Sequence, residues 1–500
     1  MALSWRPLVF LKTSRHIPQG FSACYLATQS HEIEAKSFDE IPGPKKLPIF
    51  GSMFRKRGKN LLEDYNALLE EHGPIVGEKV LNQKLVYARD PDVVKAMHRN
   101  EGKYPNRGPG MLLETLYCKE YNKSNSLASL EGEEWHKARY GVQTTLMKPK
   151  SAAPFLPGQS SVADDFVQRM RNKLNAKSEI DDYQQELFRY ALEAVCILAF
   201  DKRLGCFDDE ADHSDAQKLV SNLEQIMQCF DDAVKPKEMV MLFSFPKMSS
   251  VYKKHRKHAD AMREVKDKFL QDAMERLKTE DKPRFLKFMI EDAKLPLEYV
   301  DIIITSFMVA GVDSTANTLS WLLYNLAKNQ EPQEKLREEI NKNIPKEGEV
   351  DDKMFNKMPY LRACLKEAFR ILPPFPTGVP RVMPEDVVIA GYSIPKGTMI
   401  IPMAHQMCKS EEYFSEPLRY MPERWVRGET REDMHPFILL PFGHGSRSCL
   451  GRRFAEQEIY LAISKIIQNF QVEYHYEDLG YQFKTFLRPD KPLKFKFSPL

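Results

Sequence analysis

One cysteine of this chain, Cys449, lies in the segment PFGHGSRSCLG at residues 441–451. The segment fits the frame Phe-x-x-Gly-x-Arg-x-Cys-x-Gly, which should arise by chance in roughly 1 in 10⁴ chains of this size. A cysteine that ligates a metal must be a thiolate, and N–H donors, cations and a helix N-terminus all stabilise a thiolate. The run AEQEIYLAISKII, at residues 455–467, predicts a helix directly after the segment.

Haem iron is the metal that suits this loop. Glycines at positions 443, 445 and 451 let the backbone approach a flat macrocycle where a Cβ would collide. Arg447 can pair with a haem propionate, and a cysteine thiolate is a known axial ligand of haem. The alternative is a buried structural cysteine in a glycine-rich turn. Cys449 alone would favour that alternative, but the whole frame favours haem.

A second candidate for chemistry lies in the long apolar segment at residues 297–329. Its apolar residues recur with helical spacing and no proline interrupts them, which predicts a helix of about 50 Å. The helix contains AGVDST at residues 310–315. Gly311 costs about 1 kcal/mol relative to alanine inside a helix, which is reasonable if the helix bends there. In isolation, Asp313 would be an acid on a helix surface.

These two segments resemble the haem-binding signature and the oxygen-activation motif of the cytochromes P-450, which are haem-thiolate monooxygenases. The resemblance spans about residue 38 to the C-terminus. It implies a mainly α single-domain fold with small β-sheets, and haem b whose iron is ligated by Cys449. It also implies that the bend at Gly311 leaves room for dioxygen beside the iron, and that Asp313 and the next hydroxyl relay protons to the dioxygen. The family usually has threonine after the acid, whereas this chain has Ser314 and then Thr315, which we include as a third catalytic candidate.

Two short motifs resemble the family's structural triad. KEAFR supplies Glu367 and Arg370 at a helical i,i+3 spacing, and MPERW supplies Arg424. Trp425 stands where family members often have phenylalanine. The alternative for the first pair is a surface ion pair worth under ~1 kcal/mol.

Two further motifs are expected beside the haem propionates, by resemblance. GEEWHKARYGVQ carries Trp135 and Arg139, and PFPTGVPRV carries Arg381. Buried propionates need cationic or hydrogen-bonding partners. The expected cofactor-binding residues are therefore Cys449, Arg447, Arg139, Trp135, Arg381, Phe442, Gly443, Gly451, Ala310 and Gly311. By position alone, Phe307, Val379 and Met383 are expected in the substrate pocket.

The first 31 residues predict a mitochondrial transit peptide. They contain Arg6, Lys12 and Arg15 and no acid. A membrane anchor would need about 20 consecutive apolar residues, and these cations and Pro18 interrupt every such window. We expect a leader at about residues 1–31 and one catalytic domain at residues 32–500. The formal net charge of +3 belongs to the three leader cations, so no basic field points to nucleic acid.

The resemblance also implies redox partners. Members of the mitochondrial branch receive electrons from a two-iron, two-sulphur ferredoxin, which an NADPH-dependent reductase reduces. The segment at residues 187–207 resembles that branch. The expected docking cations are Arg362 and Lys366, at i,i+4 spacing, and Arg452 and Arg453. The second pair directly follows residues 441–451, which we call the cysteine loop. Their alternative is an ordinary solvated surface.

Together, these features predict a mitochondrial monooxygenase that inserts one oxygen atom from O2 into a lipophilic, steroid- or sterol-like substrate. The alternatives are a xenobiotic-oxidising enzyme in the same compartment, an isomerase or peroxygenase that needs no reductase, and a non-catalytic haem sensor or electron carrier. The run MVMLFSF at residues 239–245, with KKHRKH at 253–258, predicts peripheral contact with the matrix side of the inner membrane. Burial of that run in the core is an equal alternative.

Overall fold

The structure is a computed structural model. It describes residues 35–500 except 46–50, 53–60, 109–111, 209–213, 234, 281–283, 347, 429–432 and 484. The predicted leader therefore lies outside the described residues. Residues 36–500 cluster as one compact unit.

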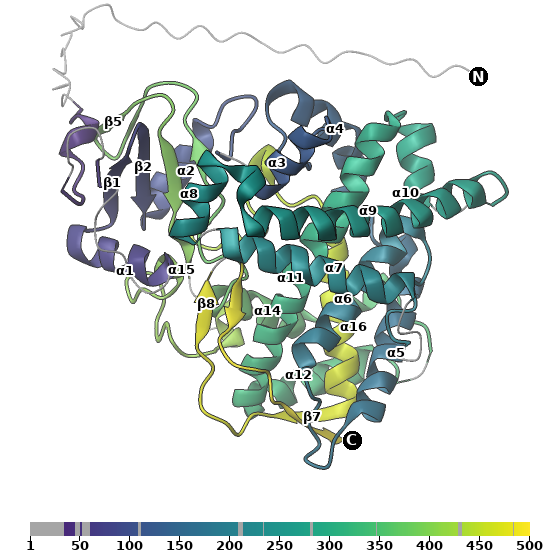
Figure 1. The fold of residues 1–500 in the computed structure, drawn as a ribbon. Coiled ribbons are helices and arrows are strands. Elements are labelled where there is room, and N and C mark those ends of the chain that lie inside the picture. The colour runs from purple at the N-terminus through teal and green to yellow at the C-terminus, as the bar shows by residue number, and fades with distance from the viewer. Residues whose placement is uncertain are drawn as a thin grey trace, which may run out of the picture. The chain divides into compact units, whose positions relative to one another are not determined.

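Helices dominate this unit (Figure 1). Their bounds are α1 Leu61–His72, α2 Pro91–Arg99, α3 Leu112–Glu120, α4 Gly132–Leu146, α5 Leu156–Lys173, α6 Tyr183–Phe200, α7 Asp215–Ala233, α8 Pro236–Ser244, α9 Ser250–Leu277, α10 Arg284–Lys287, α11 Leu297–Lys328, α12 Gln330–Asn343, α13 Asp352–Asn356, α14 Pro359–Ile371, α15 Ala404–Cys408 and α16 Arg452–Asn469. The long helix expected at residues 297–329 is confirmed as α11, and the helix expected after the cysteine loop is confirmed as α16.

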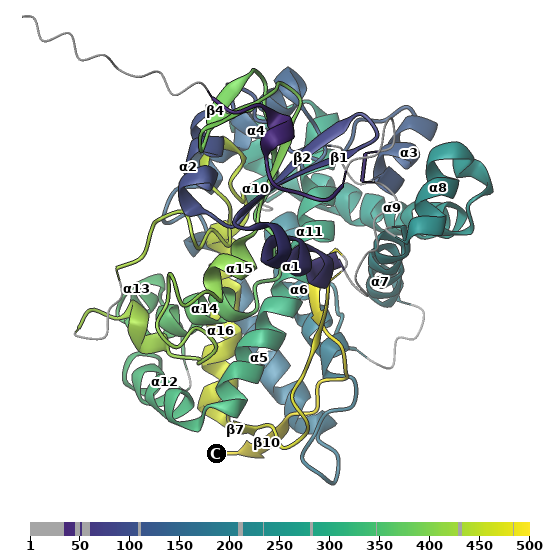
Figure 2. The same ribbon diagram turned by 90° about the vertical axis from the view of Figure 1, so that its left-hand side faces the viewer.

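The strands form small sheets. Their bounds are β1 Ile75–Val80, β2 Gln83–Ala88, β3 Arg381–Val382, β4 Val387–Ile389, β5 Tyr392–Ile394, β6 Met399–Pro402, β7 Phe470–Glu473, β8 Tyr481–Phe483, β9 Leu487–Pro489 and β10 Lys496–Pro499. One sheet has the order β1-β2-β6-β3, with β2 and β6 parallel, and the other three are antiparallel pairs. Figure 2 shows β1 and β2 above α1, and α12, α14 and α16 in the lower part of the view.

The central helix α11 explains how the core is organised. Almost every side chain from Val312 to Ala327 is buried, because α6, α14 and α16 pack around it. By length and composition α11 could cross a membrane, but 61% of its most apolar window is buried inside the protein, which is typical of a core helix. One turn nearer its N-terminus, Ala310 is exposed and Phe307, Gly311 and Ser314 are half-buried. These four residues share one face, at spacings of three and four.

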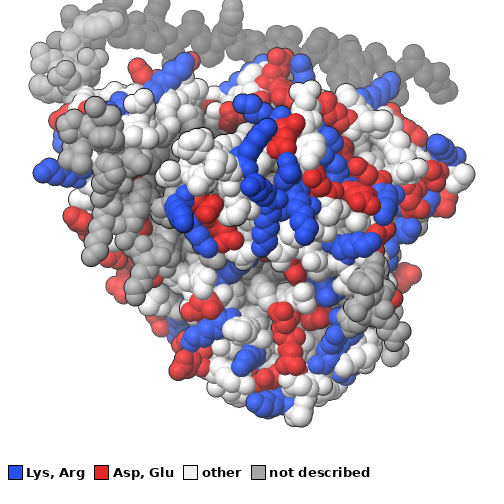
Figure 3. Space-filling model, in the orientation of Figure 1, with Lys and Arg blue, Asp and Glu red and all other residues white. Residues whose placement is uncertain are grey.

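The apolar run at residues 239–245 forms α8 and its C-terminal end. Val240, Phe243 and Phe245 are 61%, 70% and 61% exposed, whereas Leu242 is buried. The alternative that this run belongs to the core is therefore wrong for most of its side chains. Figure 3 shows several Lys and Arg side chains near the start of α9, beside a white area of uncharged residues.

Candidate active site

The cysteine loop is a compact turn held by its own backbone. The Cys449 N–H donates to the Phe442 carbonyl at 2.7 Å, and the Ser448 N–H donates to the Gly445 carbonyl at 3.1 Å. Gly443 and Gly445 both have φ of +71°, a conformation that glycine adopts without strain. A Cβ on Gly445 would also lie 2.7 Å from Glu101 Oε1. These contacts present Cys449 at the surface of the loop, where the residue is exposed.

Opposing effects act on the Cys449 thiol. The surrounding protein raises its pKa by desolvation, although the residue as a whole is exposed. The Gly451 N–H donates to the sulfur and lowers the pKa, as do the charges of Arg139, Arg107 and Arg452. The helix α16 begins at Arg452, so its N-terminal end also faces the loop. The loop thus offers a thiolate several favourable interactions.

The partly exposed face of α11 lies against this loop. A Cβ on Gly451 would lie 3.3 Å from Cε1 of Phe307, so the Phe307 ring covers the backbone two residues after Cys449. Ala310 and Ser314 continue the same face. The structure therefore brings together the two motifs that are about 140 residues apart in the sequence.

The three catalytic candidates on α11 point in different directions. Ser314 lies on the partly exposed face, and its hydroxyl donates to the Ala310 carbonyl at 2.7 Å. Asp313 is buried, and its Oδ2 accepts from Arg488 Nη2 at 2.7 Å. Thr315 is also buried, and its hydroxyl donates to Glu458 of α16 at 2.6 Å. This geometry favours Ser314 over Thr315 as the hydroxyl that serves the exposed face.

Gly311 also has a role in helix packing. Its added Cβ would lie 3.0 Å from Cγ2 of Val195, so the glycine lets α11 pack closely on α6. The helix runs unbroken through this position, from Leu297 to Lys328. Close helix packing therefore gives the glycine a role of its own, and the expected bend beside dioxygen stays a prediction.

Glu458, which receives the Thr315 hydroxyl, is fully buried in the core. Burial raises the pKa of this carboxyl from 4.5 to about 8, and the bond from Thr315 opposes the shift. The folded protein therefore keeps Glu458 protonated at neutral pH. Sequence reasoning missed this residue because Glu458 looks like one of several acids on an amphipathic helix.

We expect Glu458→Gln to reduce the pH dependence of stability. The folded-state pKa is raised, so folding retains a proton that the unfolded chain loses, and wild-type stability falls as pH rises from about 4.5 to about 8. Glutamine has the shape of the protonated acid and does not ionise. Urea unfolding across this pH range measures the effect, and equal pH slopes in both proteins would contradict an acidic group protonated by burial.

A cluster of arginines lies beside the cysteine loop. Arg447 donates from Nε and Nη2 to the carbonyls of Pro105 and Leu130, both at 2.8 Å, and its guanidinium lies 3.8 Å from the Trp135 ring centre. Arg139 donates from Nη2 to the Ser448 carbonyl at 2.6 Å, next to Cys449. The α4 segment that carries Trp135 and Arg139 thus contacts the cysteine loop directly.

Arg381 joins this cluster but already has an acidic partner. Its Nε donates to Glu101 Oε2 at 2.5 Å, and Glu101 also contacts His98 Nδ1 at 3.0 Å. Arg107 is a further member that sequence reasoning missed. Its guanidinium donates to the Arg447 carbonyl. Burial and the charges of Arg381 and Arg139 lower its pKa to about 10, and Cys449 opposes this shift. The only sequence signal for Arg107 was its place in a short Pro-Asn-Arg-Gly segment.

These residues fit haem. Arg447 Nη1 and Arg107 Nε are buried, with no hydrogen-bond partner among the described residues. Burial and the neighbouring arginines lower the pKa values of both groups, so an anionic partner would relieve the crowding. A porphyrin with two carboxylates supplies such a partner, and Cys449 supplies a thiolate on the same side.

The remaining expected residues are placed as follows. Phe442 is half-buried and its ring contacts that of Phe369, with 5.5 Å between centres. Phe307 and Val379 are half-buried, which leaves part of each side chain free to contact a ligand. Met383 is instead buried in the hydrophobic cluster that contains Val86 and Ile400, so it is not a pocket residue.

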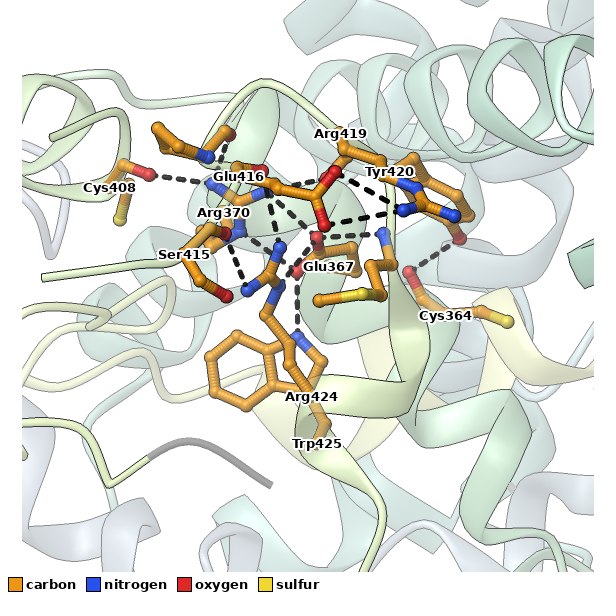
Figure 4. Close-up of polar contacts among 12 residues, drawn as sticks. Cys364, Glu367, Arg370, Cys408, Ser415, Glu416, Arg419, Tyr420, Arg424 and Trp425 are labelled. Atoms are coloured by element: carbon orange, nitrogen blue, oxygen red, sulfur yellow. Dashed lines mark hydrogen bonds and ion pairs between the residues drawn. The ribbon is translucent and has the colours of Figure 1, made fainter. Parts of the chain in front are cut away.

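Glu367, in α14, lies at the centre of a buried ion network (Figure 4). Arg370 donates to its two oxygens at 2.9 and 2.8 Å, and Arg424 Nε donates to Oε1 at 3.0 Å. The Trp425 indole N–H donates to Oε2 at 2.8 Å, a bond that phenylalanine could not make. The three triad side chains are fully buried. They join α14 to the 3-10 helix Pro422–Trp425.

The four expected docking cations lie on α14 and α16. Arg362, Arg452 and Arg453 all lower the pKa of Tyr460 through their charges, so the three arginines lie near one side chain. Lys366 is exposed one turn after Arg362. Arg452 and Arg453 both pair with Glu456, at 2.9 and 3.5 Å. These four cations therefore form a patch with a net positive charge. Glu456 lowers that charge by one unit.

Comparison with known proteins agrees with this geometry. A family model described as Cytochrome P450 matches residues 41–497. "Probable cytochrome P450 12a5, mitochondrial" of Drosophila melanogaster is 30% identical over 99% of this chain and 97% of its own length. "Cytochrome P450 CYP12A2" of Musca domestica is 32% identical over 94% of this chain and 93% of its own length. "1,25-dihydroxyvitamin D(3) 24-hydroxylase, mitochondrial" of Rattus norvegicus is 30% identical over 91% of this chain and 87% of its own length.

Proposed function

Because the chain belongs to the cytochrome P450 family and is therefore a haem-dependent monooxygenase, we propose that it inserts one oxygen atom from O2 into a steroid- or sterol-like substrate in mitochondria. The electrons come from NADPH through ferredoxin reductase and a two-iron, two-sulphur ferredoxin. The observation that carries this proposal is the exposed Cys449 beside the Ala310–Ser314 face of α11 and four arginines. The mitochondrial relatives support the compartment, and the name of the rat relative supports a sterol-like substrate.

Each residue has a separate task in this proposal. Haem b, when bound, supplies the oxygen-activating chemistry. Cys449 would ligate its iron, and Arg447, Arg139 and Arg107 would hold its carboxylates, with Trp135 packed on Arg447. Arg381 shares its charge between Glu101 and a carboxylate. Ser314 passes a proton on the partly exposed face, and Asp313 supplies it.

Turnover of the purified protein tests the proposal. The protein would first be screened by haem absorbance against cholesterol, progesterone, cholecalciferol and the xenobiotic 7-ethoxycoumarin. Binding compounds would then be incubated with ferredoxin, its reductase, NADPH and O2. A hydroxylated product that requires both ferredoxin and O2 supports the proposal. Product without ferredoxin favours an isomerase or peroxygenase, and intact haem protein that yields no product favours a sensor or carrier.

The proposal includes the organisation of the chain. Residues 1–31 act as the import leader, with an approximate boundary, and residues 32–500 form the catalytic domain. The compact unit that begins at Lys36 is compatible with this division. Mass spectrometry of the N-terminus of the imported protein measures the boundary.

The cations on α14 and α16 form the proposed ferredoxin-docking patch. We expect Lys366→Glu and Arg453→Glu to raise the ferredoxin KM, because an acidic partner would meet a reversed charge. The effect should weaken steeply with added salt. Stopped-flow reduction by ferredoxin measures it, and Lys278→Glu on the end of α9 is the matched charge reversal outside the patch. Unchanged kinetics in folded haem protein would contradict docking here.

The exposed side chains of α8 form the proposed contact with the matrix side of the inner membrane. Phe243 and Phe245 are apolar and mostly exposed, and Lys253, Lys254 and Arg256 lie on the neighbouring α9. This combination suits an anionic lipid surface. We expect Phe243→Glu to reduce flotation with cardiolipin-containing liposomes. Equal flotation of Phe243→Glu and wild type would argue against membrane contact at α8.

A further inference from the structure

Lys409, the residue that follows α15, lies among groups that disfavour a positive charge. Its Nζ lies 5.3 Å from the centre of the Tyr481 ring, in β8. Arg370, in α14, donates from Nη1 to the carbonyl of Cys408 at 2.7 Å, so a guanidinium lies beside the residue that precedes Lys409. The fold therefore holds a lysine close to a second cation and partly covers it with a ring.

No carboxylate pairs with Lys409 among the residues that the structure describes. Both oxygens of Glu367, the acid at the centre of the neighbouring ion network, accept from Arg370. Glu63, in α1, acts instead on Tyr481, whose pKa is raised by burial and then by that negative charge. The ammonium group of Lys409 thus lacks the counter-ion that a partly buried cation usually has.

Two lysines that are more deeply buried show the usual arrangement. Lys266 Nζ lies 2.9 Å from Oδ1 of Asp267, and Lys465 Nζ lies 2.8 Å from Oδ1 of Asp164. Their side chains are only 2% and 3% exposed, and yet both have an acid to stabilise the charge. Lys409 differs from them in its partners, and not only in its burial.

These surroundings make the amine of Lys409 reactive. Burial and then the charge of Arg370 lower its pKa from 10.5 to about 8, and Cys408 opposes the shift. His405, one turn earlier on α15, adds no compensating charge, because burial lowers its pKa well below 6.5 and keeps it neutral. About one quarter of the Lys409 amine is then unprotonated at pH 7.5, and only the unprotonated amine is a nucleophile. Lys409 is half-buried, so a reagent in solution can reach it.

We infer that Lys409 is an acylation site, whose amine takes an acyl group from a thioester such as an acyl-coenzyme A. The amine nitrogen attacks the thioester carbonyl, a C–N bond forms and the C–S bond breaks. The proton of the amine passes to the leaving thiolate, so the products are an amide and a free thiol, and no electron is transferred. The amide is uncharged, so acylation removes the cation beside Arg370. This inference does not depend on the proposed function.

Peptide mass spectrometry of the full-length haem protein, incubated with acetyl-coenzyme A, tests this inference. At pH 7.5, Lys409 should be acetylated about tenfold faster than Lys278, because its larger unprotonated fraction outweighs the weaker nucleophilicity of a less basic amine. Lys278 is an exposed lysine at the end of α9, and Lys465 is a second reference, buried but paired with an acid. The rate at Lys409 should rise from pH 7 and level off near pH 9. A rate at Lys409 no higher than that at Lys278, or one that still rises steeply above pH 9, would overturn the inference.

Substitution of Tyr481 tests whether this cluster activates the amine. Tyr481→Ala exposes Lys409 to water and should lower its acetylation rate several-fold relative to Lys278. Tyr481→Phe keeps the ring and is the matched control, which should keep the wild-type rate. Equal rates at Lys409 in the two variants would contradict activation by the cluster. If Tyr481→Ala does not fold, the pH dependence of the wild-type rate still decides the inference.

Discussion

Cys449→Ser should abolish monooxygenation and remove the red-shifted Soret band of the reduced, carbon-monoxide-bound protein. The band requires a thiolate ligand, and the electron density of that ligand favours cleavage of the O–O bond. A serine hydroxyl is similar in size but stays protonated at neutral pH, because alcohols are far weaker acids than thiols. The Gly451 N–H and the nearby arginines, which lower the thiol pKa, do not overcome that difference. The spectrum of purified protein and product formation with ferredoxin measure the two effects.

Cys118→Ser is the matched control for this substitution. Cys118 is a half-buried cysteine of α3, outside the loop at residues 441–451. The control should keep both the band and the activity. A thiolate band in Cys449→Ser would show that another cysteine ligates the iron, and the proposed site would then be wrong.

The parts of the site that the sequence predicted depend on short spacings. The cysteine loop, the Glu367–Arg370 pair and α11 each lie within one continuous segment, where residue spacing determines which side chains meet. Trp135 and Arg447 were expected near each other only through the family resemblance. The structure adds the physical contact, a guanidinium stacked 3.8 Å from the indole ring centre.

The parts that the sequence did not predict join distant segments. Arg381 and Glu101 are 280 residues apart, and Arg488 and Asp313 are 175 residues apart. No local period relates such positions, so their pairing depends on how the helices pack. The same holds for Gly311, whose neighbour Val195 belongs to α6. A glycine beside an oxygen-activation motif invites a local explanation, but its contact with Val195 depends on the crossing of two helices.

Glu367→Gln should destabilise the protein by about 3–5 kcal/mol, because it leaves two buried guanidinium groups without their counter-ion. Glu367 accepts hydrogen bonds from Arg370, Arg424, Trp425 and the Met421 N–H. Arg370 and Arg424 also donate to backbone carbonyls, including those of Cys408 and Ser415, but carbonyls do not neutralise charge. Since domains are stable by only about 5–15 kcal/mol, a large fraction of the stability would be lost.

Urea unfolding followed by far-ultraviolet circular dichroism measures this loss of stability. Haem retention reports its effect on the site around Cys449. Glu416→Gln is a matched control, because the same substitution there breaks only an exposed pair with Arg419, worth under about 1 kcal/mol.

Trp425→Phe isolates one bond of the network and should cost about 1.5–3 kcal/mol, since it removes a hydrogen bond to a charged group. If Glu367→Gln cost no more than Glu416→Gln, the network would not stabilise the cysteine side of the fold. An intermediate cost for Trp425→Phe would instead show that this chain uses its tryptophan as a fourth member of the triad.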